Sequence, residues 1–171
     1  AGYNADVAIG QFDTLVSPIQ TANAYASLAN PEGRLYRPSV LAAVKRANKQ
    51  ALARLVRDRV GIGIDADALF DVQIKRIHEY KRQLLNLIET VALYDQIRSH
   101  PERDWVPRVK IFGGKAAPSY HNAKLIIKLA NDIARRVNSD PSVGGLLKVV
   151  FVPNYNVSLA EKIIPAADLS E

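Results

Sequence analysis

The sequence has no cysteine, no methionine and only three histidines. Without cysteine, the chain forms no disulfide, no thiolate metal site and no cysteine nucleophile. The histidines at positions 78, 100 and 121 lack the HxxxH spacing of a helical metal site, so we expect no bound metal. No run approaches about eighteen consecutive apolar residues, and no leader-like segment opens the chain. We therefore expect a cytoplasmic protein without a membrane span.

The composition is that of a globular protein rather than a disordered or low-complexity one. The 171 residues are 48% hydrophobic and 23% charged, which suffices for one packed core. The net charge of +6, from 23 basic and 17 acidic residues, favours anionic ligands only weakly. Because methionine is absent even from position 1, we expect a processed chain or a fragment.

The first part of the chain differs from the rest. Residues 1 to about 34 form an irregular, unassigned segment, in which Ser17-Pro18 is a candidate helix start. From Pro38, apolar residues recur at helical spacing until Gly61, a typical residue after a helix end. The other face of this predicted helix is basic, and we interpret it as a solvated surface. It carries Lys45, Arg46, Lys49, Arg54 and Arg57.

After residue 68 the pattern alternates between strand and helix. Strands are predicted over residues 68–76, 108–112 and 146–152, and helices over 78–98, over 118–137 and from near Ser158. This β-α-β-α-β-α order predicts an α/β domain over residues 35–171, built on an open parallel sheet of three strands.

The first strand-to-helix junction is crowded with cations. Four cations and one histidine lie within eight residues: Lys75, Arg76, His78, Lys81 and Arg82. Ligands of open α/β sheets bind beyond the strand ends, where a helix N-terminus carries partial positive charge. Cations there repel one another and the helix dipole unless an anion binds among them, so we interpret the junction as a phosphate site. The alternative is a solvated face in which Glu79 neutralises one cation.

The second junction carries a weaker signal. Gly113-Gly114 matches no P-loop or dinucleotide motif, and a tight turn explains it at least as well as a phosphate cradle. Tyr120 and His121 follow, and we expect them to pack in the core or at the rim rather than stack on a ligand.

The third junction would bring Tyr155 and Asn156 to the same sheet edge as Lys75. Ser158, with Glu161 three residues later, predicts a capping box at the start of the last helix. No nucleophile elbow accompanies these residues.

Long stretches of the chain match one family. The longest, from Phe70 to Asn86, reads FDVQIKRIHEYKRQLLN. The others are Val44–Gln50, Gly113–Pro118, Tyr120-His121, Asn154-Tyr155, Val157–Lys162 and Ile164–Glu171. Together they cover roughly residues 43–171 and resemble the α-glucan phosphorylases, which are the glycogen, starch and maltodextrin phosphorylases.

The resemblance implies a Rossmann-like sheet in the C-terminal half of a two-domain GT-B glycosyltransferase. The family reaction is the reversible phosphorolysis of α-1,4-glucan by inorganic phosphate, which gives glucose 1-phosphate. Its cofactor is pyridoxal 5′-phosphate, whose phosphate rather than aldehyde takes part in proton transfer. The resemblance further implies a homodimeric parent enzyme that binds neither nucleic acid nor membrane.

Residue roles follow from motif position. Lys75 resembles the lysine that contacts the cofactor phosphate. Arg76 and Lys81 resemble the cations that hold inorganic phosphate, and Tyr80 resembles the tyrosine beside the glucose. Tyr155 resembles a residue that lines the cofactor.

Three features depart from the family pattern. Residues 1 to about 34 match no part of it. Asn156, a candidate cofactor contact, stands where many members have arginine near the cofactor phosphate. No lysine follows Lys162, so we expect the Schiff-base lysine to lie outside this chain and the chain alone to be inactive.

Two other classes of protein stay open. One is a nucleotide-sugar glycosyltransferase of the same fold. The other is a non-catalytic module that binds anions or nucleic acid through the basic helix and residues 75–82.

Overall fold

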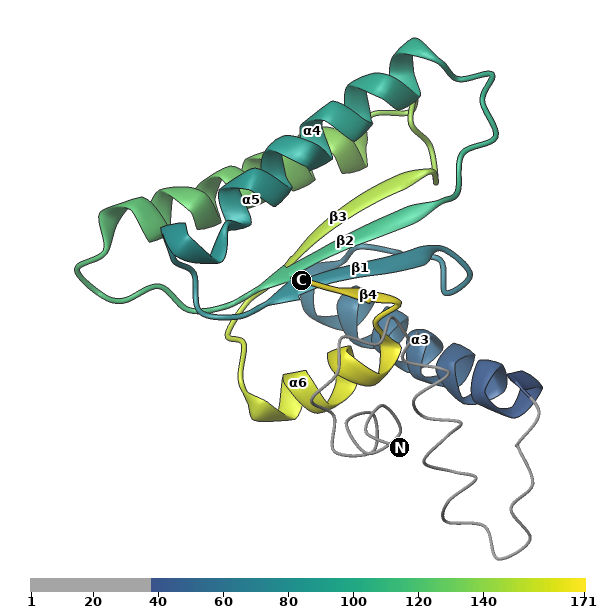
Figure 1. The fold of residues 1–171 in the computed structure, drawn as a ribbon, viewed down its shortest axis with the longest axis horizontal. Coiled ribbons are helices and arrows are strands. Elements are labelled where there is room, and N and C mark those ends of the chain that lie inside the picture. Colours follow the sequence, from purple (N-terminus) through teal and green to yellow (C-terminus); the bar gives the residue numbers. More distant parts are fainter. Residues whose placement is uncertain (1–37) are drawn as a thin grey trace, which may run out of the picture. The chain divides into compact units, whose positions relative to one another are not determined.

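The computed structural model describes residues 38–171, drawn as a ribbon in Figure 1. The irregular segment 1–34, its candidate helix start and the domain boundary at residue 35 lie outside the described residues. Residues Lys45–Glu171 form one compact unit. In the part that the structure describes, no helix is long and apolar enough to cross a membrane.

The first described helix, α3 (Pro38–Val60), agrees with the prediction. Gly61 ends it with a φ of +72°, and its N–H donates to the Arg57 carbonyl at 2.9 Å. Leu52 and Val56 are buried on its inner face. Gly61 therefore supplies the left-handed conformation that helix ends favour.

The basic face of α3 is not simply solvated, and that prediction is wrong in part. The Lys49 side chain is only 9% exposed, and its ammonium lies 2.6 Å from the Asp168 carboxylate. Lys45 donates to the Ala167 carbonyl. Both lysines bind the carboxyl-terminal segment, which packs back against this helix. The local sequence around the lysines does not indicate this contact.

The remaining elements alternate as predicted. They are β1 (Leu69–Ile74), the 3-10 turn η1 (Glu79–Lys81), α4 (Gln83–Ser99), β2 (Arg108–Gly113), α5 (His121–Ser139), β3 (Leu147–Val152), α6 (Val157–Ile163), the 3-10 turn η2 (Ile164–Ala166) and β4 (Leu169–Ser170). All four strands are parallel, in the order β3-β2-β1-β4. The α/β class and the open parallel sheet are confirmed.

The expectation of three strands is wrong, because β4 adds a fourth beside β1. It has two residues, and Leu169 pairs with Asp71. A strand this short has no alternation that a sequence pattern can reveal.

Each face of the sheet is covered by a pair of helices (Figure 1). One core, which includes Leu87, Ile126 and Val149, lies beneath α4 and α5. The other, which includes Leu52, Val150 and Leu159, lies beneath α3 and α6. Because both faces of the sheet are covered, consecutive strand residues are buried whichever face they point to, as is usual for parallel sheets.

The chain changes direction at β1. It moves outward through β2 and β3, then returns through α6 to add β4 on the other side of β1. In open α/β sheets such a reversal leaves a crevice outside the carboxyl ends of the two central strands. Here those ends lead into Lys75 after β1 and Glu171 after β4.

Candidate anion-binding site

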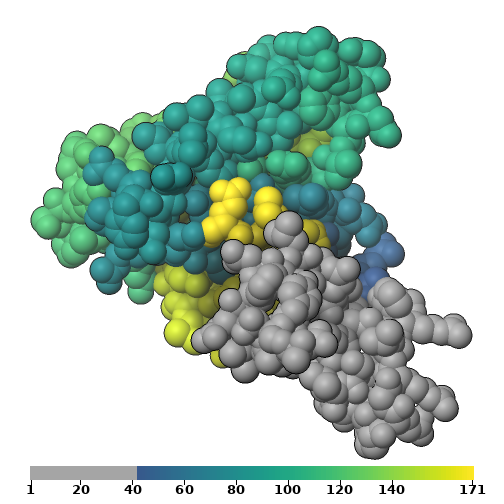
Figure 2. All heavy atoms as spheres, viewed as in Figure 1, coloured from purple at the N-terminus to yellow at the C-terminus, as the bar shows by residue number. Residues whose placement is uncertain are grey.

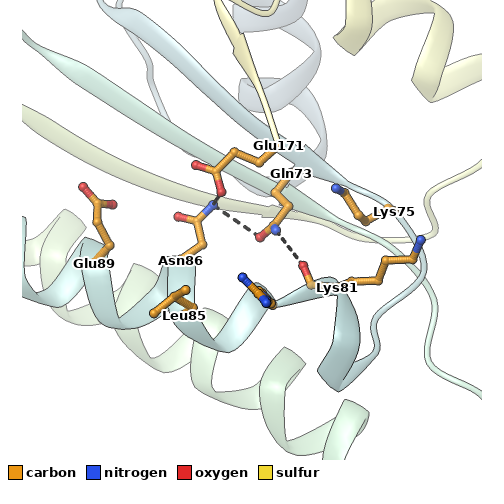
Figure 3. Close-up of a pocket in the computed structure, with 8 residues that line it drawn as sticks. Gln73, Lys75, Lys81, Leu85, Asn86, Glu89 and Glu171 are labelled. Atoms are coloured by element: carbon orange, nitrogen blue, oxygen red, sulfur yellow. Dashed lines mark hydrogen bonds between the residues drawn. The ribbon is translucent and has the colours of Figure 1, made fainter.

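A pocket of about 360 Å³ lies at this crevice (Figure 3). It is lined by Gln73, Lys75, Lys81, Arg82, Leu85, Asn86, Glu89 and Glu171. The two lysines lie on one side of it and Glu89 on the other. The carboxyl-terminal residues, yellow in Figure 2, reach the surface beside α4, where the Asn86 amide donates to the Glu171 carboxylate at 2.9 Å.

The basic junction is a loop rather than the first turn of a helix. The helix predicted from residue 78 begins at Gln83, which corrects the predicted placement of Lys81 and Arg82 in its first turn. Lys81 belongs to the preceding turn η1, which the His78 ring nitrogen caps by accepting the Tyr80 N–H at 3.3 Å. Arg82 then takes a left-handed φ of 58°. The cations still lie at the positive end of α4.

Glu79 does not neutralise these cations. Its carboxylate accepts hydrogen bonds from the Tyr120 hydroxyl and from the Asn122 amide at 3.2 Å. These bonds lower the pKa of Glu79, and the same contact raises the pKa of Tyr120. The alternative interpretation is therefore wrong in assigning Glu79 to a basic neighbour, although Arg76 and Arg82 are exposed as it expects.

The cations themselves differ in exposure. Lys75 and Lys81 are half-buried in the pocket, whereas Arg76 and Arg82 are exposed. The Lys81 ammonium lies 4.7 Å from the centre of the Tyr80 ring. Across residues 38–171, none of these four cations forms an ion pair. Their positive charge is available to an anionic ligand.

The acidic side of the pocket is tied to a buried lysine. The Lys110 ammonium lies 2.6 Å from the Asp71 carboxylate and 2.6 Å from that of Glu89. Burial raises the pKa of Glu171, and the negative charge of Asp71 raises it further. The lysine therefore offsets negative charge that would otherwise weaken anion binding.

Sequence reasoning missed five of the lining residues. They are Gln73, Leu85, Asn86, Glu89 and Glu171. A signal was present in the strands, because Asp71, Gln73 and Lys110 occupy interior positions of parallel strands, where apolar residues are the rule.

The glycine pair lets two backbones meet. The Lys75 N–H donates to the Gly113 carbonyl at 3.1 Å, and the Ile77 N–H donates to the Lys115 carbonyl at 3.1 Å. A Cβ atom on Gly114 would lie 2.1 Å from the Lys75 carbonyl oxygen. The close approach at Gly114 thus continues the pairing of the two chains beyond β1 and β2 and holds the basic loop. The turn itself lies later, at residues 118–119, so the interpretation of the glycine pair as a tight turn is wrong.

The predicted tyrosines and Asn156 lie outside the pocket lining. Tyr80 is 66% exposed. Tyr155 is half-buried, and one of its ring carbons would lie 3.7 Å from a Cβ on Gly113. The Asn156 side chain caps α6 by accepting the Leu159 N–H at 3.0 Å.

The capping box predicted at Ser158 is wrong, because α6 begins at Val157 with Asn156 as its N-cap.

Of the predicted site residues, the structure brings Lys75 and Lys81 together in one pocket and leaves Arg76, Tyr80 and Tyr155 outside its lining. Tyr120 is partly buried against the core beneath α4 and α5, and its ring lies 4.9 Å from that of His78. Among the residues described, no group of three or more His, Asp or Glu side chains could hold a metal ion.

A family profile described as carbohydrate phosphorylase matches residues 28–171. The chain belongs to this family. It is 55% identical over 131 residues to the glycogen phosphorylase of Pasteurella multocida, covering 77% of this chain and 16% of that protein. It is 56% identical over 128 residues to the glycogen phosphorylase of Synechocystis, which covers 75% of this chain and 15% of that protein. It is 53% identical over 131 residues to the human liver form, covering 77% of this chain and 16% of that protein.

Membership in the carbohydrate phosphorylases confirms the resemblance that the motifs indicated. The chain spans about 16% of the length of the relatives it matches. The parallel sheet is the corresponding Rossmann-like part of a phosphorylase.

Proposed function

We propose that this chain forms the phosphate-binding part of an α-glucan phosphorylase active site. The observation that carries the proposal is the pair Lys75 and Lys81, half-buried in one pocket at the crevice where the strand order reverses. Relatives named glycogen phosphorylase, at 53 to 56% identity, support the assignment. The reaction is the reversible phosphorolysis of α-1,4-glucan to glucose 1-phosphate.

In this proposal the cations are divided between two phosphates. Lys75 holds the cofactor phosphate, and Arg76 and Lys81 hold inorganic phosphate. Two phosphoryl groups close together repel each other, so several cations are required to offset the repulsion. The same cations stabilise the negative charge on phosphate opposite an oxocarbenium-like transition state. Tyr80 lies beside the glucose, and its exposed ring suits a contact with sugar.

The residues present fit the phosphate end of pyridoxal 5′-phosphate. Two half-buried lysines line one side of a pocket of about 360 Å³, which lies within the usual range for cofactor sites, about 300–1,000 Å³. When bound, the cofactor supplies a phosphate that takes part in proton transfer through the substrate phosphate. Tyr155 and Asn156 follow β3 at the same edge of the sheet and would contact the cofactor from there.

A nucleic-acid-binding module is less well supported. Lys45 and Lys49 on the basic helix contact the carboxyl-terminal segment of the same chain, so they are not available as a phosphate-binding row. Nothing observed favours a nucleotide-sugar substrate.

The proposal is tested in a chimeric enzyme. The 131 residues of this chain that match the Pasteurella multocida glycogen phosphorylase would replace the corresponding residues of that enzyme. The release of glucose 1-phosphate from glycogen would then be measured. We expect phosphate-dependent turnover, with R76A raising the KM for phosphate. A chimera that prefers a nucleoside diphosphate sugar, or whose phosphate kinetics R76A leaves unchanged, would contradict the proposal.

A further inference from the structure

We infer that two buried glutamines, Gln73 and Gln83, are positioning residues that fix the backbone of the basic loop 75–82 and so place Lys81 for phosphate. This inference rests on the proposed function, because it concerns the same site. Neither glutamine carries charge. Gln83 is not among the residues that line the pocket, whereas Gln73 lines it and also hydrogen-bonds to the loop backbone.

Gln83 joins two points of the loop. Its side chain is 1% exposed. Its amide nitrogen donates to the Arg76 carbonyl at 3.1 Å, and its amide oxygen accepts the His78 N–H at 3.3 Å. One side chain therefore forms hydrogen bonds with a backbone carbonyl and a backbone N–H that have no partner in a helix or in the sheet.

Gln73 holds the other end of the loop. It is the last buried residue of β1, with 3% of its surface exposed. Its amide nitrogen donates to the Lys81 carbonyl at 3.1 Å, as Figure 3 shows. The residue that carries the phosphate-binding ammonium is thus bonded directly to the sheet.

The direction of the Gln73 amide is set by a buried ammonium. Lys110 can only donate, and it donates to the Asn86 side-chain oxygen at 3.0 Å. The Asn86 nitrogen must then face outward, and it donates to the Gln73 oxygen at 3.3 Å. The Gln73 nitrogen is left to point at Lys81. A buried network with one fixed donor at its origin has one arrangement, which suits it to positioning.

The loop requires such anchors because its own conformation is irregular. Arg82 is left-handed at a φ of 58°, and residues 75–78 belong to no helix or strand. A loop that is ordered before phosphate binds loses less conformational entropy on binding than a loose one. Removing an anchor should therefore weaken phosphate binding, and a change at Gln83 does so without altering any residue of the pocket lining.

The test uses Q73M and Q83M in the chimeric enzyme, with Q96M as the matched control. Gln96 lies on the same helix as Gln83 but is exposed. Methionine keeps the length of the side chain, adds no charge and removes the amide. Losing anchoring hydrogen bonds predicts an increase of about fivefold or more in the KM for phosphate, with an unchanged KM for glycogen. A merely structural role would lower thermal stability and move neither KM selectively.

Several results would overturn the inference. Phosphate KM values of folded Q73M and Q83M equal to that of Q96M would do so. If both variants fail to fold, side-chain amide hydrogen exchange in the unaltered chain decides, because anchoring glutamines exchange far more slowly than Gln96, and equal rates refute the inference. If the unaltered chimera lacks phosphorolysis, the proposed function fails. Calorimetric phosphate affinity of the 171-residue chain and its Q73M and Q83M variants then tests the glutamines separately.

Discussion

Replacing Lys110 by methionine should be among the most destabilising single changes in this chain. The side chain is 2% exposed, and its ammonium contacts Asp71 at 2.6 Å, Glu89 at 2.6 Å and Asn86 at 3.0 Å. Methionine fills a similar volume but leaves the Asp71 carboxylate, which is 1% exposed, without its close cation. The remaining cation, Arg108, lies 3.7 Å away and is 32% exposed.

Removing one partner of a buried ion pair costs about 3–5 kcal/mol, and we expect K110M to lower the free energy of unfolding by this amount. Replacing Asp71 by asparagine leaves Lys110 with Glu89 and Asn86, so D71N should cost about 1–3 kcal/mol. In the double variant no uncompensated buried charge remains, so the two losses should not add. The cycle should show a coupling energy of at least about 2 kcal/mol.

Urea unfolding of the chain, followed by circular dichroism, measures all four free energies. K148M is the matched control, because Lys148 lies on the outer strand β3 and is half-buried. In the described part of the chain its ammonium forms no ion pair and donates one hydrogen bond, to the Asn138 carbonyl at 3.4 Å. It should change stability by less than about 1 kcal/mol. Additive losses in the double variant, or a K110M loss no larger than that of K148M, would refute the assignment of Lys110 as the charge that neutralises this buried cluster.

Two further predictions concern glycine and pH. G114A should destabilise the chain and disturb the basic loop, because the new Cβ atom would lie 2.1 Å from the Lys75 carbonyl oxygen. G145A should be neutral, because its Cβ atom would meet nothing within 4 Å. Equal urea unfolding midpoints for the two variants would contradict this prediction. Hydrogen bonds from Ser142 and Tyr94 lower the pKa of Asp140, and the Asp140 bond raises the pKa of Tyr94. Stability from Asp140 is present above its ordinary pKa of 3.8 and lost as pH falls, and stability from Tyr94 is present below 10.0 and lost as pH rises. D140N should reduce both the fall of the urea unfolding midpoint at low pH and its fall at high pH. An unchanged dependence of the midpoint on pH would contradict the role given to Asp140 and Tyr94.

The alternation of strands and helices could be predicted because burial imposes it on the sequence. β1, β2 and β3 sit between two helix layers, so their apolar runs stand out from the amphipathic helices on either side. The basic loop could be found for a related reason, since four cations near a strand end conflict with ordinary local preferences.

What escaped prediction depends on distant partners. Lys49 is buried because Asp168, 119 residues away, supplies its carboxylate. The delayed start of α4 depends on Gln83 bonding to Arg76 and His78, a side-chain choice that periodicity does not encode. β4 is too short for a pattern, and without it the strand-order reversal that locates the pocket stays hidden.

The central claim is that the pocket binds phosphoryl groups through Lys75, which holds that of the cofactor, and Lys81, which holds inorganic phosphate. A phosphate titration of the labelled chain tests it most directly. Amide resonances would be followed at constant ionic strength in the unaltered chain, in K75M/K81M and in R54M/R57M, which removes two exposed cations from α3. We predict saturable shifts confined to residues 75–82 and their neighbours, retained in R54M/R57M and abolished in K75M/K81M. Absence of saturable shifts in the unaltered chain, or equal affinity in K75M/K81M, would contradict the account.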